Sequence, residues 1–122
     1  TNTTNGKENA LLFEPTLMKL KEMTSGADPT FFNQVIQMFL DQSTEIVDQI
    51  SGLLPVMDLP QMASLAHKLK GSALNLGANK IAETCRTIEI KGKDLDSYGM
   101  SDLVIRLKEG LQLTKTEIQK FL

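Results

Sequence analysis

The chain has 122 residues, 41% of them hydrophobic and 23% charged, which suits one soluble domain with a single core. Its thirteen basic and fifteen acidic residues give a formal charge of −2 without a basic stripe, so nucleic acid is not an expected partner. The lone Cys85 argues against a disulfide framework or a zinc site and favours the cytoplasm, and without an apolar run or signal-peptide pattern we expect no membrane span or anchor.

The first part of the chain divides into a polar segment and two helical patterns. Residues 1–10 are polar and unpatterned, so we expect a flexible tail there and one folded domain over residues 11–122. A short first helix is predicted over residues 14–24, where apolar residues recur every three or four positions. Asp28-Pro29 suits the start of a second helix, whose apolar pattern continues for about seven turns to Leu53. Met38 in this helix is assigned to the core.

Three more helices are predicted in the second part. The third runs from Asp58-Leu59-Pro60 to Leu76, with Gly77 as its C-terminal glycine. Asn79 is expected to cap the fourth, and Ser101 with Asp102 to open the last. The fourth helix should bury one face, made of Ile81, Cys85, Ile88 and Leu95. These elements predict an all-α fold, an antiparallel four-helix bundle with an additional short N-terminal helix.

The third helix contains the chain's only histidine, His67. Since each helical residue advances by about 100°, His67 lies roughly 160° to 200° from the apolar Leu65 and Leu69 and should face water. Gly71, one turn later, costs about 1 kcal/mol relative to Ala in a helix interior. A side chain at that position would lean toward the helix N-terminus, over the turn that carries His67. We therefore predict that Gly71 leaves the imidazole open to a large partner.

The exposed ring and the neighbouring Lys70 suggest one kind of chemistry. A neutral imidazole leaves one nitrogen free as a nucleophile, and a phosphoryl group on it would carry a dianionic charge that Lys70 could offset. Alone, an exposed histidine is usually a surface residue, and Lys70 could be an ordinary solvated lysine. Their combination with Gly71 favours phosphoryl transfer.

The segment Ala66 to Ala78, AHKLKGSALNLGA, resembles the signature of histidine-containing phosphotransfer (HPt) domains. His67 is followed by Lys at +3, Gly at +4, Ser at +5 and Gly at +10. HPt domains relay phosphoryl groups between the aspartates of receiver domains in multistep phosphorelays. The resemblance implies that His67 accepts a phosphoryl group from one receiver aspartate and passes it to another. It also implies that the receiver supplies Mg²⁺ and that this chain needs no cofactor of its own.

The following stretch, NKIAETCRTIEIKGK, resembles the next helix of the stand-alone fungal type of HPt domain. In that type a Gln or Glu hydrogen-bonds the ring nitrogen that is not phosphorylated, and a basic residue lies one turn later. Glu89 and Lys93 fall at these positions, although Glu89 could instead only pair with Lys93 at i, i+4. Lys93 stands where the fungal type has Arg, and Lys68 where an apolar docking residue is common. The docking contacts that we expect are Ser64, Lys68, Leu74 and Lys93.

The implied partners are receiver domains of hybrid histidine kinases and of response regulators, with this chain as a monomer. No glycine-rich phosphate loop is present, so we expect no ATP-dependent kinase activity. Two other classes of protein stay open. A histidine-kinase dimerisation domain is also helical with an exposed histidine, but an acidic residue usually follows that histidine, and here Lys68 does. The other alternative is a helical adaptor that carries no phosphate.

Overall fold

The computed structural model describes residues 12–24, 26 and 30–122. The expected polar tail and the Asp28-Pro29 helix start lie outside the described residues. The described part of the chain is helical and contains no strand. Its elements are α2 (Glu14–Thr24), α3 (Phe31–Gly52), α4 (Leu59–Leu76), α5 (Asn79–Lys93), α6 (Met100–Ile118) and the 3₁₀ turn η1 (Gln119–Phe121). No described helix is both long enough and apolar enough to cross a membrane.

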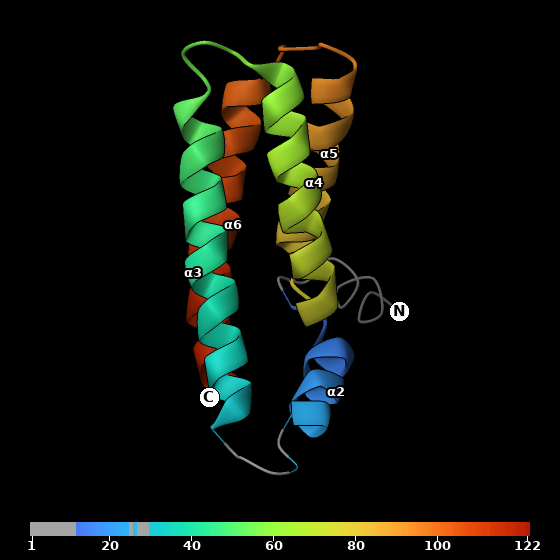
Figure 1. Ribbon diagram of the computed structural model, residues 1–122, viewed down its shortest axis with the longest axis vertical. Helices are drawn as coiled ribbons and strands as arrows, with labels where there is room; N and C mark the ends of the chain where they lie inside the picture. The colour runs from blue at the N-terminus through green and yellow to red at the C-terminus, as the bar shows by residue number, and fades with distance from the viewer. Residues whose placement is uncertain (1–11, 25, 27–29) are drawn as a thin grey trace, which may run out of the picture.

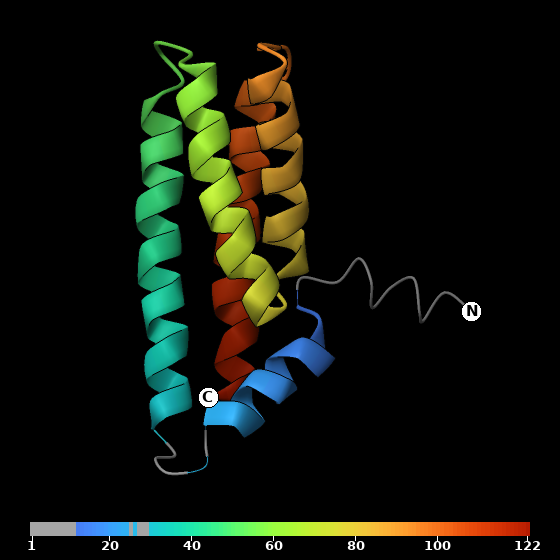
Figure 2. The same ribbon diagram turned by 45° about the vertical axis from the view of Figure 1, so that its right-hand side comes forward.

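The four long helices form an antiparallel bundle, which confirms the predicted fold class (Figure 1). α3 and α5 run in one direction, and α4 and α6 run in the other. Each long helix packs against the helices before and after it, and α3 packs against α6 to close the bundle. The short α2 lies obliquely across one end of the bundle, where it contacts α3 and α4 (Figure 2).

A single apolar core fills the bundle, as the helical periodicity of the sequence predicts. Fully buried side chains from every helix contribute to it, including Leu17, Ile36, Met62, Ile88 and Leu107. Burying a side chain of this size stabilises the fold by about 1.5 to 3 kcal/mol. The prediction that Met38 lies in the core is wrong, because its position on α3 faces outward and leaves it 60% exposed.

Both ends of α4 have capping residues, and the C-terminal one determines how the chain turns into α5. The carboxylate of Asp58 accepts a hydrogen bond from the backbone N–H of Gln61 at 3.3 Å, so the predicted start is confirmed. Gly77 closes the helix with φ 81°, a left-handed conformation that glycine adopts without strain. Ala78 then serves as the N-cap of α5, so the assignment of that role to Asn79 is wrong. This tight connection folds α5 back along α4.

The boundary between α5 and α6 also differs from the prediction. α5 ends at Lys93, and Leu95 lies outside the helix with φ 55° and is 68% exposed, so it is not part of the buried face. α6 begins at Met100 rather than at Ser101, after Gly99 in a left-handed conformation. Met100 is fully buried, and the burial of its side chain favours a helix that starts one residue before Ser101.

Candidate functional site

His67 projects from the middle of α4 on the side that faces away from the core. Its side chain is 67% exposed, whereas Ala66 and Leu69 are buried on the opposite side of the same helix. The expectation that the ring faces water is therefore confirmed. The ring lies beside α5, the helix with which α4 packs most extensively.

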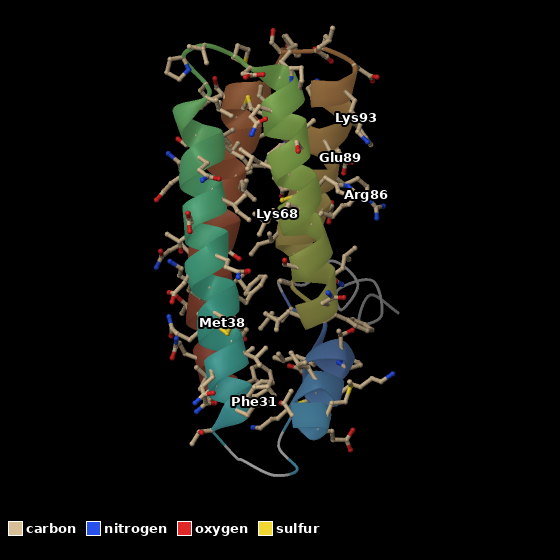
Figure 3. All side chains as sticks on the ribbon, viewed as in Figure 1. Phe31, Met38, Lys68, Arg86, Glu89 and Lys93 are labelled. Carbon is tan, nitrogen blue, oxygen red and sulfur yellow. The ribbon has the colours of Figure 1, made fainter. Side chains whose placement is uncertain are left out.

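The inner edge of the ring contacts Glu89 on α5. Nδ1 of His67 lies 2.9 Å from Oε2 of Glu89, whose side chain is only 7% exposed. Lys70 of α4 donates to Oε1 of the same carboxylate at 2.7 Å, and Lys93 of α5 reaches Oε2 at 2.9 Å. Figure 3 shows Glu89 and Lys93 following one another along α5. The structure thus brings together four residues that the sequence singles out, from two helices.

The charge state of Glu89 determines which ring nitrogen carries the proton. The hydrogen bonds from Lys70, Lys93 and His67 lower the pKa of the Glu89 carboxyl from 4.5 to about 2, against the opposing effect of burial. An ionised carboxylate only accepts hydrogen bonds, so Nδ1 of the ring must be the donor. In the neutral ring Nε2 then carries the lone pair, and no described residue bonds to it.

Lys70 is not the ordinary solvated lysine that the sequence also allows. Its side chain is only 21% exposed and turns toward α5 to meet Glu89, instead of projecting into solvent. The difference arises because a buried carboxylate on a neighbouring helix attracts the ammonium group. Two lysines therefore share one carboxylate beside the ring, which leaves an excess of positive charge at the site.

The surface on the C-terminal side of His67 is open. Gly71 is exposed, and a Cβ placed on it would meet no atom within 4 Å, so no helix crosses close to this position. Leu74, two turns after His67, is exposed as well. A partner can thus approach the ring along this part of α4.

A hollow of about 400 Å³ lies on the N-terminal side of His67. It is lined by Pro60, Ala63, Ser64, His67, Glu89, Gly92, Lys93 and Leu95. Sequence reasoning placed Ser64 and Lys93 here but missed Pro60, Gly92 and Leu95. For Gly92 a signal was available, since it is a glycine inside a helical pattern, as Gly71 is.

Lys68 lies apart from these residues. It is exposed on the side of α4 that faces α3, where it lines a small depression with Gln42, Glu45 and Gln49. Figure 3 shows Lys68 and Glu89 on different sides of α4. Lys68 therefore takes no part in the hydrogen bonds around Glu89.

Cys85 lies one turn before Glu89 and is buried, as the sequence predicts. Burial raises the pKa of its thiol to about 12, so the sulfur stays protonated and does not compete with His67 as a nucleophile. Across residues 12–24, 26 and 30–122, no three His, Cys, Asp or Glu side chains are grouped so that they could hold a metal ion.

Solved structures with this fold include histidine phosphotransfer proteins. A putative histidine-containing phosphotransfer protein from rice superposes with a TM-score of 0.80 at 22% identity, over 97% of this chain and 84% of that one. Ypd1 of Saccharomyces cerevisiae, crystallised with the receiver domain of its downstream response regulator Ssk1, superposes with a TM-score of 0.69 at 20% identity, over 91% and 89% of the two chains. At these identities the likeness establishes the fold alone.

Sequence comparison identifies the family. Histidine-containing phosphotransfer protein 2 of Oryza sativa subsp. japonica is 36% identical over 85 residues, which are 66% of this chain and 57% of that protein. The phosphorelay intermediate protein YPD1 of Candida albicans is 31% identical over 75 residues, which are 60% and 41% of the two chains. The chain thus spans about half the length of the curated relatives it matches. Residues 34–117, more than half of the chain, match the model of the Hpt domain, and the chain belongs to this family.

Proposed function

We propose that this chain is a histidine phosphotransfer module of a multistep phosphorelay, in which His67 accepts a phosphoryl group from a receiver aspartate and passes it to another. The observation that carries the proposal is the hydrogen bond between Nδ1 of the exposed His67 and the buried, ionised Glu89. That bond leaves the Nε2 lone pair available to an incoming phosphorus atom. Membership of the Hpt domain family supports the same conclusion.

The transfer step forms one bond to phosphorus and breaks another. The Nε2 lone pair attacks the phosphorus of the receiver's aspartyl phosphate, an N–P bond forms, and the P–O bond to the aspartate breaks. The bonding electrons leave with the aspartate carboxylate. The ring keeps its Nδ1 proton and becomes positively charged, which the Glu89 carboxylate stabilises. The reverse sequence returns the phosphoryl group to a second receiver.

Lys70 and Lys93 favour the phosphorylated state through their charge. Both ammonium groups already contact Glu89, so two positive charges face one negative charge before transfer. A dianionic phosphoryl group on the ring would meet this excess positive charge. Gly71 keeps the approach to Nε2 free, while Ser64, Leu74 and the more distant Lys68 offer contacts to the docked receiver.

The proposed partners are receiver domains of hybrid histidine kinases and response regulators, which the crystallised pair of Ypd1 and the Ssk1 receiver domain supports by analogy. The receiver would supply the Mg²⁺ that the transfer requires, and the chain would work as a cytoplasmic monomer without ATP. A helical adaptor would take no phosphoryl group from a receiver, and a kinase dimerisation domain would form its bundle from two chains.

The test is incubation with a receiver domain that carries a radiolabelled phosphoryl group. We expect label on His67 in an acid-labile, alkali-stable bond, and none on His67→Gln. Lys70→Ala should slow labelling about ten- to a hundredfold, since a charged hydrogen bond contributes about 1.5 to 3 kcal/mol. Lys108→Ala, an exposed lysine on α6, is the matched control and should react at the wild-type rate. Label on His67→Gln, or none on the wild type, would contradict the proposal.

A further inference from the structure

α4 and α5 lie in close contact at Gly92. This glycine is buried in α5, and a Cβ built on it would lie 2.7 Å from the backbone oxygen of Leu59 and 2.8 Å from the Cβ of Ala63. The Cα of Ala63 would be 3.3 Å away. Ordinary contacts of a Cβ begin at 3.4 Å, and two of these atoms belong to the backbone, so they can retreat only if the helix moves. The spacing of the two helices at this point requires glycine.

The close approach lies next to the histidine. Gly92 is three residues after Glu89 on α5, and Ala63 is four residues before His67 on the antiparallel α4. The Gly92–Ala63 contact is thus one helical turn, about 5.4 Å, from the His67–Glu89 hydrogen bond along both helices. A change in helix spacing at the first pair is transmitted to the second, because no flexible segment separates them.

A methyl group on Gly92 would have to move the helices apart by about 0.7 Å to restore an ordinary contact with the Leu59 oxygen. The distance between Nδ1 and Oε2 is 2.9 Å, and a shift of that size would carry it past the range of a hydrogen bond. Glu89 has little freedom to follow the ring, since it is buried and both its oxygens are held by Lys70 and Lys93.

We infer that Gly92 is a positioning residue for His67: its lack of a side chain sets the distance between α4 and α5 that lets Glu89 hold the ring with its proton on Nδ1. The consequence for phosphoryl transfer rests on the function proposed above, whereas the consequence for the ring does not. Gly92 has no side chain that could bond to the ring, so it acts through the position of Glu89.

The chain offers a matched control at Gly110. Gly110 is a buried glycine inside α6, and a Cβ on it would meet its nearest atom, Cγ of Lys80, at 3.9 Å, an ordinary contact. Gly92→Ala and Gly110→Ala therefore make the same chemical change at buried helical positions. They differ in whether the change forces two helices apart.

The first measurement uses the fact that the chain has one histidine, so a protein labelled with ¹⁵N-histidine shows a single imidazole. In the neutral form of the ring, we expect the wild type and Gly110→Ala to carry the ring proton on Nδ1. Gly92→Ala should shift the ring toward the Nε2–H form that an unconstrained histidine side chain prefers in water. Ala63→Ser enlarges the other side of the same contact and should produce the same shift, which keeps the test available if Gly92→Ala does not fold.

The second measurement follows transfer from phosphoramidate, a small donor that needs no docking surface and releases ammonia as its phosphoryl group moves to Nε2. We expect Gly92→Ala to react about tenfold or more slowly than the wild type, and Gly110→Ala to react normally. The inference is overturned if Gly92→Ala keeps the Nδ1–H form. If the variant loses that form and still reacts at the wild-type rate, the positioning of the ring stands and its consequence for transfer is overturned. A wild-type protein that takes no phosphoryl group defeats the proposed function instead, while a ring proton that still moves in Gly92→Ala upholds the positioning of His67.

Discussion

At His67, the reactive group is in water but the group that sets its protonation is not. The side chain of His67 is 67% exposed and that of Glu89 only 7%. The carboxylate is therefore largely shielded from water, while Nε2 of the ring remains accessible. This division lets one histidine be both well oriented and open to a protein partner.

Glu89 should make the stability of the fold depend on pH under acid conditions. The pKa of Glu89 falls from 4.5 to about 2 on folding, so its ionised form stabilises the fold above about pH 4.5, and this contribution is lost as the pH falls toward 2. The wild type should therefore be more stable than Glu89→Gln at neutral pH, and the difference in unfolding free energy should shrink through that window. Urea titrations at several pH values measure it. A difference for Glu89→Gln that stays constant over these pH values would refute the linkage.

A substitution at Gly71 can separate access to the ring from packing, because the position has open space around it. Gly71→Gln should block docking or transfer, because its side chain would lean over the ring. Its free energy of unfolding should hold or rise by about 0.5 kcal/mol, since Gln forms helix better than Gly and the position has open space around it. Gly71→Ala is the control, with the gain in helix propensity but a side chain too short to cover the ring. A Gly71→Gln protein with native transfer, or with markedly lower stability, would contradict the role in access.

Most residues of the site could be predicted, and the exceptions share a cause. His67, Lys70 and Gly71 follow from rotation along a single helix, and Glu89 from resemblance to a family pattern. The orientation of Lys70 and the role of Gly92 depend on how closely two helices approach, which periodicity within one helix does not specify. Such contacts become visible only when both helices are in place.

At the scale of elements, the connection between α4 and α5 also anchors α2. The backbone oxygen of Gly77 accepts a hydrogen bond from the N–H of Phe13 at 2.6 Å, and a Cβ on Gly77 would lie 2.7 Å from the Phe13 oxygen. The glycine therefore serves two purposes, a left-handed helix end and room for the chain that enters α2.

Gly77→Ala should accordingly destabilise the protein. The left-handed conformation costs a non-glycine residue about 1 to 2 kcal/mol, and the clash with Phe13 adds to it. Thermal and urea unfolding would measure the loss. Gly71→Ala, which gains helix propensity without a clash, should change stability in the opposite direction, and an unaltered Gly77→Ala protein would show that the chain near Phe13 adapts at no cost.

Helix existence was predictable from periodicity, whereas several helix ends were not. The cap at Asp58 and the glycine at Gly77 were predictable because each has a local chemical signature. Asn79 was misplaced because the N-cap of α5 is Ala78, whose side chain has no capping group. Leu95 was misplaced because α5 ends at Lys93 and Leu95 adopts a left-handed conformation beyond it. Tertiary packing decides such ends, as the burial of Met100 shows.

At the scale of the whole molecule, one chain supplies all four helices of the bundle. The arrangement followed from helix number and short connections, which restrict neighbours to antiparallel packing. A kinase dimerisation domain, by contrast, builds its bundle from two chains.

Sedimentation equilibrium should therefore give a mass near 13.5 kDa over a range of concentrations. The reason is that the apolar faces of α3 to α6 are already covered within one chain. A mass that doubles with concentration at micromolar protein would favour the two-chain alternative. The size of the His67→Gln protein should match the wild type, since His67 takes no part in the core.

The tight turn between α4 and α5 also has a consequence for how the protein folds. His67 and Glu89 are 22 residues apart and joined by a single helical hairpin, so few residues must be ordered before the two side chains meet. Contacts of such low sequence separation form quickly, whereas α3 must find α6 across most of the chain. Refolding followed by the imidazole resonance should thus reach its native value no later than refolding followed by the contacts between α3 and α6. The hairpin that brings His67 and Glu89 together is in this sense a local folding unit.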